Sequence, residues 1–449
     1  MSPTFSPSAA SNIRFLVDTA TSGTPPTLPS TLLHLISHDN NILFSHGSTS
    51  FPDLPTPTST SLFTLHSLTK PLGTILFLRL TELYPSLTLD SPTLIPTHLP
   101  ELATKKVLTG YTVAPSGTKT WHLEDQHGTI TPRMLLNHTY GGGHTYFNRL
   151  LFEYVNDKLG VWASANEIAD IYQALLASPL LWQPGTHTNY GQGFDWLAVL
   201  IERFTKRSLP DLLEEYIFAP LGITDIGYEA AYGGTLTATQ EQRGKFWQRS
   251  WKQEDGSFVV VDPSVPEIVQ KNDAFPIGSQ HIHPFGTGLI GSAQSVARIM
   301  SILLPQNAGV DPVTKTRILS EENVRAMISP QLPSHIRNQS RKIESADAVP
   351  NMIIPIDLSV PHLDPEGSFG LGCGVQGAER VLENGQRGRS KGSVYWYGAA
   401  NSEVWVDGEK GVVGVVNAGF FPWNEGRWIE WVGGVEGEVY GGLKEEGEI

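Results

Sequence analysis

The sequence predicts an α+β fold, an α/β sandwich in which one antiparallel sheet is built from both ends of the chain and flanked by helices. Strand-like runs lie at residues 32–45 and again at 370–416. Between about 97 and 282 the apolar residues recur with helical spacing, which indicates an inserted helical subdomain. Because strands at both termini enclose a helical middle, the ends of the chain are expected to close a single sheet.

The N-terminal elements follow from local patterns. Residues 9–21 have helical spacing, and a Pro-Pro pair shortly after them ends the helix. Apolar runs at 32–37 and 42–45, joined by an Asp-Asn turn, predict a β-hairpin. A loop rich in Pro, Ser and Thr spans 51–61 and leads into an apolar helix that is expected to begin at Ser67.

The middle of the chain carries start signals for several helices. Thr131-Pro132 opens a helix with proline at its first position. Residues 164–167 form a capping box before a helix over 168–176. Two further amphipathic stretches, 195–204 and 209–218, predict helices that pack against a core.

Strand patterns return in the last third of the chain, at 370–375, 393–398, 403–406 and 412–416. A final helix places five large apolar side chains on one face: Trp428, Trp431, Val432, Val435 and Val439.

We interpret residues 1–449 as a single catalytic domain. Residues 1–96 together with 283–449 are expected to contain the sheet, and residues 97–282 to form the mainly helical insertion. Ligand pockets often lie at boundaries between subdomains, so the catalytic cleft is expected between the sheet-containing part and the helical insertion.

Composition excludes several classes of function. The net charge of −14 argues against a nucleic-acid surface, because phosphate binding depends on Lys and Arg. A lone Cys373 cannot form an internal disulfide, and the first residues lack the basic and apolar regions of a signal peptide. No apolar run approaches the ~18 residues of a membrane span. We therefore expect a cytoplasmic protein without a membrane anchor; the oligomeric state is left open.

The most informative pattern is Ser67-Leu68-Thr69-Lys70 at the start of an apolar helix. Residues three apart share a helix face, so the Lys70 amine is brought toward the Ser67 hydroxyl. The unpaired N–H groups of the first turn point to the same place. Serine followed by lysine at this spacing is the arrangement by which penicillin-recognising enzymes activate a nucleophile without a histidine triad.

Two other serines match nucleophile patterns without the required context. Ser116 precedes Lys119 by three residues, but it lies in a polar Pro/Gly stretch with no apolar run behind it. Ser390 is the centre of a G-x-S-x-G pattern, which needs a strand before it and a helix after it; here a polar turn precedes and a strand-like run follows. We expect neither to be the nucleophile.

Several segments, taken together and in order, resemble the serine β-lactamase-like esterases and transesterases. Within that group the chain is most similar to the fungal lovastatin-type acyltransferases of secondary metabolism. The resemblance runs from about residue 10 to 440 and implies the fold of serine β-lactamases and penicillin-binding proteins. The segments that carry it are 63–70, 130–139, 184–196, 219–225, 368–372, 391–407 and 421–424.

The family's second catalytic group is a tyrosine, and two positions compete for it. Tyr154 belongs to a literal Tyr-x-Asn, but it shares a helical stripe with apolar residues and is expected to face the core. Tyr190 has Gln192 where the family has Asn, yet it follows a Pro-Gly turn and precedes the Asp195-Trp196 helix, as in the family. We prefer Tyr190 as the catalytic tyrosine.

The third family element is a cleft-lining strand, which here corresponds to Trp396-Tyr397-Gly398. Trp396 stands where β-lactamases have lysine, so the cation that pairs a β-lactam carboxylate is missing and penicillin hydrolysis is disfavoured. Both aromatic side chains are expected to line the cleft, although simple alternation would place one inside and one outside. Tyr140 stands where the family often has serine, and it is counted with Gln192 among the predicted substrate-binding residues.

The resemblance implies a serine acyltransferase that works through an acyl-enzyme. Ser67 would attack an ester or thioester, and a neutral Lys70 with Tyr190 would take the proton. The backbone N–H groups of Ser67 and Ala399 would stabilise the oxyanion. The acceptor would be an alcohol, and no metal or organic cofactor is required. A carboxylesterase with the same site is the alternative, and a catalytically inactive binding module is a third reading.

The remaining candidate residues, three histidines, are expected to have structural roles. His281 and His283 could be two metal ligands on a strand, but no further ligand cluster accompanies them. His138 is expected to be structural, at the end of the Thr131 helix.

The basic run 387–391 is typical of a solvated loop. If an acyl carrier protein delivers the acyl group, its acidic surface would need local positive charge. The candidates for that contact are Arg387, Arg389 and Lys391.

Overall fold

The computed structural model describes residues 3–160, 171–228, 246–260, 282–337, 342–343, 360–361, 366–382 and 384–444. Its centre is a seven-stranded antiparallel sheet in the order β12-β13-β14-β15-β16-β2-β3. The strands are β2 (Ser30–Ser37), β3 (Ile42–Thr49), β12 (Ser368–Phe369), β13 (Gly374–Val375), β14 (Val394–Gly398), β15 (Ser402–Asp407) and β16 (Val412–Asn417).

The strands from the two ends of the chain join where β16 pairs with β2, one strand in from the β3 edge. Val415 lies opposite His34 in that pair. The predicted N-terminal hairpin is the β2–β3 pair. The prediction of one antiparallel sheet built from both chain ends is confirmed.

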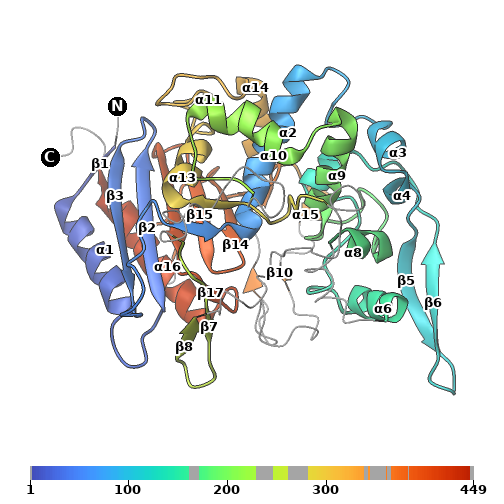
Figure 1. Cartoon of the computed structure of the whole chain (residues 1–449), viewed down its shortest axis with the longest axis horizontal. Coiled ribbons are helices and arrows are strands. Elements are labelled where there is room, and N and C mark those ends of the chain that lie inside the picture. The colour runs from blue at the N-terminus through green and yellow to red at the C-terminus, as the bar shows by residue number, and fades with distance from the viewer. Residues whose placement is uncertain are drawn as a thin grey trace.

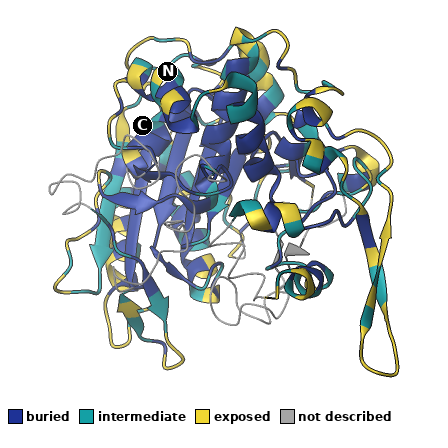
Figure 2. Ribbon diagram, turned by 45° about the vertical axis from the view of Figure 1, so that its right-hand side comes forward, coloured by how far each residue is buried: buried dark blue, intermediate teal, exposed yellow. Residues whose placement is uncertain are grey.

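Helices cover both faces of the sheet (Figures 1 and 2). On one face, α1 (Pro7–Ala20) and α16 (Gly426–Gly442) pack against each other. On the other lie α2 (Thr69–Leu83), α9 (Gly193–Thr205) and α13 (Ala293–Ser301). The pleat of β2 divides its side chains accordingly, since Leu33 and Leu35 join the α1/α16 core while Leu32 and Ile36 join the other. The predicted apolar face of the final helix is buried in the α1/α16 core.

The same alternation separates the two aromatic residues that were expected to line the cleft together. Trp396 on β14 packs in the core on the α2 side of the sheet, whereas Tyr397 packs on the α1/α16 side with Tyr395. The Tyr397 ring lies 5.6 Å from that of Tyr395 and 6.4 Å from that of Trp423. The prediction that Tyr397 shields the cleft is therefore wrong, because successive strand residues point to opposite faces.

The middle of the chain is mainly helical. Besides α9 it contains α3 (Leu94–His98), α4 (Pro100–Ala103), α5 (Pro132–Leu136), α6 (Arg149–Leu159), α8 (Ile171–Ala177), α10 (Leu209–Leu213), a π-helical turn (Glu214–Phe218) and α11 (Ala219–Leu221). The predicted capping box at 164–167 lies outside the described residues.

Strands interrupt this helical region, which the sequence did not predict. β5 (Val107–Val113) and β6 (Lys119–Glu124) form a hairpin whose residues are largely exposed. It projects from the body of the molecule at the right of Figure 1. β7 (Ser250–Lys252) and β8 (Phe258–Val260) form a small sheet with β17 (Phe420–Phe421). Leu108 and Trp121 pack against α6, but most other residues of the hairpin are exposed, so the alternation that marks a half-buried strand is weak. The division at 96/97 and 282/283 stays a prediction.

Short pairs and helices complete the described chain. β4 (Leu62–Thr64), which ends shortly before Ser67, pairs with β9 (Ile290–Ser292). The remaining elements are β1 (Thr4–Phe5) paired with β18 (Leu443–Lys444), β10 (Lys342–Ile343) paired with β11 (Val360–Pro361), α14 (Glu321–Ile328) and α15 (Ser334–Arg337).

The basic run before β14 is not a solvated loop throughout. Arg389 is fully buried and forms ion pairs with Glu403 on β15 and with Glu436 on α16. Burial alone would raise the pKa of Glu436, but the charges of Arg389 and Arg380 hold it below its usual value. Arg387, by contrast, is exposed. The sequence prediction was wrong for Arg389, whose charge joins the sheet to α16.

Candidate active site

Ser67 lies in a single 3-10 turn, His66–Leu68, that leads directly into α2. The α-helix itself begins at Thr69, two residues later than predicted. His66 has a φ of +48°, a conformation that few residues other than glycine adopt, so the chain turns sharply before the serine. Lys70 is one turn further on, and its Nζ donates to Ser67 Oγ over 3.0 Å.

Tyr190 reaches the same point from a different part of the chain. It precedes α9 by three residues, and its phenol oxygen lies 2.8 Å from Ser67 Oγ. The Lys70 Nζ lies 4.9 Å from the centre of the Tyr190 ring. The structure thus brings together the three side chains that the sequence analysis selected.

Lys70 is buried, with 1% of its surface exposed. Its amine also donates to the backbone carbonyl of Gly286 over 2.7 Å. A buried amine is costly unless its hydrogens find acceptors, and these two contacts direct Nζ at Ser67.

Aromatic rings enclose Tyr190. The rings of His138 and Trp396 lie 4.9 and 5.5 Å from it. The Gly191 N–H also donates to His138 Nδ1 over 3.4 Å, so His138 helps to hold the tyrosine segment. His144 and Phe147, with rings at 5.2 and 5.9 Å, were not selected from the sequence. The closely spaced His144, Tyr146 and Phe147 were the sequence feature that could have indicated them.

The end of β14 lies against the turn that carries Ser67. A side chain at Gly398 would place its Cβ 2.7 Å from the Leu65 carbonyl oxygen, so only glycine permits this approach. Ala399, the predicted second oxyanion donor, follows directly. Its role stays a prediction.

Tyr140 and Gln192 have little surface to offer a substrate. They are 2% and 3% exposed, and Gln192 is the N-cap residue of α9. Their assignment to substrate binding stays a prediction.

His66, next to the nucleophile, is a residue that the sequence analysis missed. Burial, reinforced by the nearby charge of Arg249, holds the pKa of its imidazole well below 6.5. Its ring packs edge-on against Phe421 at 5.7 Å. A neutral imidazole at this place adds no positive charge beside Lys70.

The competing candidates lie in other surroundings. Ser116 is exposed in the β5–β6 turn, and Lys119 pairs with Glu153. Ser390 donates its backbone N–H to Asp407 and precedes a strand, so no nucleophile elbow forms. Tyr154 packs in a separate core, with the ring of Trp121 at 5.1 Å.

No metal site is found in the part of the chain that the structure describes. His283 Nδ1 lies 2.6 Å from Glu202 Oε1, within hydrogen-bond distance. His281 lies outside the described residues.

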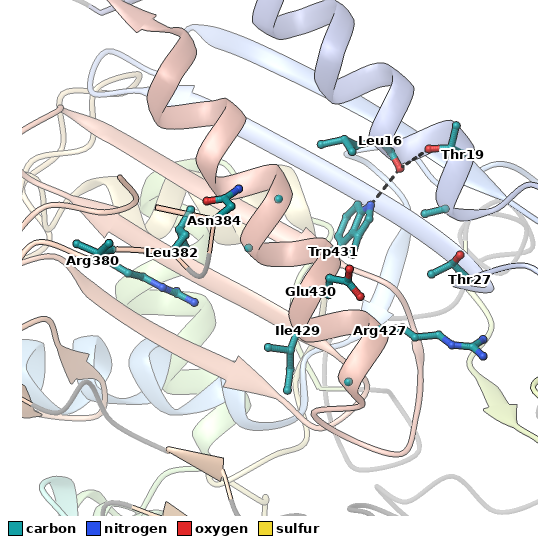
Figure 3. A pocket seen from close by; sticks show the side chains of 15 residues that line it. Leu16, Thr19, Thr27, Arg380, Leu382, Asn384, Arg427, Ile429, Glu430 and Trp431 are labelled. Atoms are coloured by element: carbon teal, nitrogen blue, oxygen red, sulfur yellow. Dashed lines mark hydrogen bonds between the residues drawn. The ribbon is translucent and has the colours of Figure 1, made fainter. Parts of the chain in front are cut away.

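A separate pocket of about 990 Å³ lies between α1, α16, residues 380–382 and Asn384 (Figure 3). Trp431 forms part of its wall and donates to the Leu16 carbonyl over 3.2 Å. The helices that line this pocket cover the face of the sheet opposite to α2, so it is not continuous with the surroundings of Ser67.

Comparison with known proteins identifies the family of the chain. A beta-lactamase family model matches residues 29–429. The chain belongs to the beta-lactamase family. It is 28% identical over 327 residues to monacolin J acid methylbutanoyltransferase of Aspergillus terreus, which covers 73% of this chain and 70% of that protein. A shorter match, 36% identical over 131 residues, joins it to lovastatin esterase of Penicillium rubens and covers 28% of this chain and 30% of that protein.

Solved structures share the fold. Simvastatin synthase from Aspergillus terreus, in a mutant form, aligns with a TM-score of 0.72 at 23% identity, over 96% of this chain and 98% of that one. EstCE1, a hydrolase with promiscuous acyltransferase activity, aligns with a TM-score of 0.66 at 17% identity, over 96% and 98%. The predicted β-lactamase and penicillin-binding-protein fold is confirmed.

Family membership makes the chain an enzyme of the serine hydrolase and acyltransferase type. None of the helices in the described ranges is long and apolar enough to cross a membrane.

Proposed function

We propose that this enzyme transfers an acyl group from a thioester or ester to an alcohol of a natural product, through an acyl-enzyme on Ser67. The proposal rests on one observation. Ser67 Oγ forms hydrogen bonds both with Lys70 Nζ, at 3.0 Å, and with the Tyr190 phenol, at 2.8 Å. A hydroxyl held between an amine and a phenol can lose its proton as it attacks a carbonyl.

In the acylation step, Ser67 Oγ attacks the donor carbonyl while its proton passes to the neutral Lys70 amine, with Tyr190 as the second member of the proton path. The N–H groups of Ser67 and Ala399 hold the oxyanion that forms. Collapse of this intermediate expels the thiol or alcohol, which takes the proton, and leaves the acyl group on Ser67.

In the second step, Tyr190 and Lys70 remove the proton from an acceptor alcohol, whose oxygen attacks the acyl-enzyme. The new ester departs and Ser67 recovers its proton. Transfer requires that the acyl-enzyme resist water, and the rings of Trp396, His138 and Phe147 around Tyr190 reduce access of water to this point.

The relatives support an acyl transfer of this kind, since several are named acyltransferases or methylbutanoyltransferases. A carboxylesterase with the same residues is the second candidate, favoured by the lovastatin esterase match. An inactive binding module is disfavoured, because all three side chains are present and in contact.

An acyl carrier protein as donor is a finer proposal. Arg389 cannot contribute to such a contact, because it is buried in ion pairs. Only Arg387 and Lys391, both exposed, remain of the three basic residues first considered.

Product partitioning tests the proposal. The protein is mixed with acyl pantetheine thioesters and a panel of polycyclic alcohols, and ester and free acid are quantified. The intact mass after brief exposure to each thioester reports the acyl-enzyme. We expect ester to increase with alcohol concentration and the Ser67→Ala variant to gain no mass. Free acid alone at every alcohol concentration would favour the esterase, and a mass gain on Ser67→Ala would refute the assigned site.

A further inference from the structure

A buried carboxylate, that of Asp195, holds the segment whose Gly286 carbonyl accepts a hydrogen bond from the Lys70 amine. Asp195, in the first turn of α9, is 6% exposed. Its Oδ1 accepts hydrogen bonds from the backbone N–H groups of Phe285, over 3.1 Å, and of Gly286, over 2.9 Å. The carbonyl of the same Gly286 is the acceptor of the Lys70 amine. The carboxylate therefore fixes the peptide segment that orients the lysine.

We propose that Asp195 is a positioning residue that acts through Lys70. By holding residues 285–286, it sets the place of the carbonyl that aims the Lys70 amine at Ser67. The inference rests on the role of Lys70 in the proposed function and adds a residue that does not itself contact the nucleophile.

Close packing leaves this segment little freedom. A Cβ at Gly286 would lie 2.9 Å from Asp195 Oδ2, so only glycine allows the carboxylate to approach both N–H groups. A Cβ at Gly73, one turn after Lys70 on α2, would lie 2.6 Å from the Phe285 ring. The segment is thus held by hydrogen bonds to α9 and by direct contact with the helix that carries the lysine.

Helix α9 makes a second contact with this segment, which provides a matched control. Glu202 lies two turns after Asp195 on α9 and is bonded to His283, three residues before Gly286. Both carboxylates tie the same segment to the same helix, but only Asp195 accepts a hydrogen bond from the N–H of Gly286, the residue whose carbonyl accepts from Lys70. Loss of Glu202 should loosen the segment without redirecting the lysine.

A double-mutant cycle tests the proposal on the full-length enzyme. The rate of labelling by a fluorophosphonate and the kcat and KM for a small aryl ester are measured. We expect Asp195→Ala to lower the labelling rate and kcat by about 10- to 100-fold with KM nearly unchanged, because misplacing a catalytic group by about 1 Å has a cost of this size. Asp195→Asn, which keeps an acceptor oxygen, should stay within about fivefold of the parent, and Glu202→Gln within about threefold.

The decisive measurement is made in the Lys70→Ala background, over long labelling times. If Asp195 acts through Lys70, adding Asp195→Ala should change the residual rate by less than about threefold, since groups that act as a unit are not additive. An equal penalty in both backgrounds, or a fully active Asp195→Ala, would overturn the proposal. If circular dichroism finds Asp195→Ala unfolded, Gly286→Ala replaces it in the same cycle with the same criteria. A fully active Lys70→Ala would instead refute the proposed function.

Discussion

The phenol oxygen of Tyr190 lies 2.8 Å from Ser67 Oγ, although 123 residues separate the two in the chain. Lys70, by contrast, reaches the same oxygen from three residues away. The nucleophile is therefore served by one local and one distant partner.

Replacing Ser67 by alanine should abolish covalent labelling and turnover together, because no other atom takes the place of its Oγ between Lys70 and Tyr190. A fluorophosphonate probe and intact mass spectrometry measure the loss. Ser116→Ala and Ser390→Ala are the controls and should label like the parent. A Ser390→Ala variant that neither labels nor turns over substrate would contradict the assignment of the nucleophile.

Replacing Tyr190 by phenylalanine should lower kcat by about 10²-fold or more, the usual size of a lost general acid or base. The ring contacts with His138 and Trp396 remain, so the melting temperature should change little. Tyr154→Phe is the matched control, and its activity should equal that of the parent. If Tyr190→Phe is as active as the parent, Tyr190 is not the catalytic acid or base, and the Lys70 amine alone would activate Ser67.

Replacing Arg389 by methionine should lower the free energy of unfolding by about 3–5 kcal/mol, because the buried Glu403 would lose its ion pair and the buried Glu436 would keep only its pair with Arg380. Urea denaturation measures the change. Arg387→Met, two residues away, removes an exposed pair with Glu379 and should lower it by less than about 1 kcal/mol. Similar losses in both variants would contradict the burial of Arg389.

Acid should destabilise the fold through His34. Burial lowers the pKa of this imidazole from 6.5 to about 4, so between these values the unfolded chain binds the proton and the folded chain does not. The contribution of His34 to stability is complete above pH 6.5 and is lost as the pH falls toward 4, by about 3 kcal/mol in total.

Urea unfolding of the His34→Asn variant at pH 7 and pH 4.5 checks this expectation. The variant should lose less stability over that range than the parent, whereas replacing the exposed His127 should leave the difference unchanged. An unaltered pH dependence in His34→Asn would exclude His34 as its source.

The sequence predicted the elements whose local pattern is strong. The final helix, the β2–β3 hairpin and the start of α2 near Ser67 belong to this group. Ser67 and Lys70 could be paired from spacing alone, because a helix fixes the relation of residues three apart. Tyr190 needed the family resemblance.

What the sequence did not reveal depends on tertiary contacts. The ion pairs of Arg389 with Glu403 and Glu436 come from distant segments, so a basic run looks solvated until the fold is known. The β5–β6 hairpin buries few of its residues, so its strand pattern is weak in the sequence. The contact of Lys70 with Gly286 uses a backbone carbonyl, which leaves no mark in the side-chain sequence.

That contact joins residues 216 positions apart and so depends on loop closure over nearly half of the chain. Contacts of such separation impose a large entropic cost before they stabilise the fold, and they tend to form slowly. Catalytic competence should consequently be among the last properties to return when the denatured enzyme refolds. Helical circular dichroism should recover first, and fluorophosphonate reactivity, which requires the 285–286 segment to be in place, should recover later.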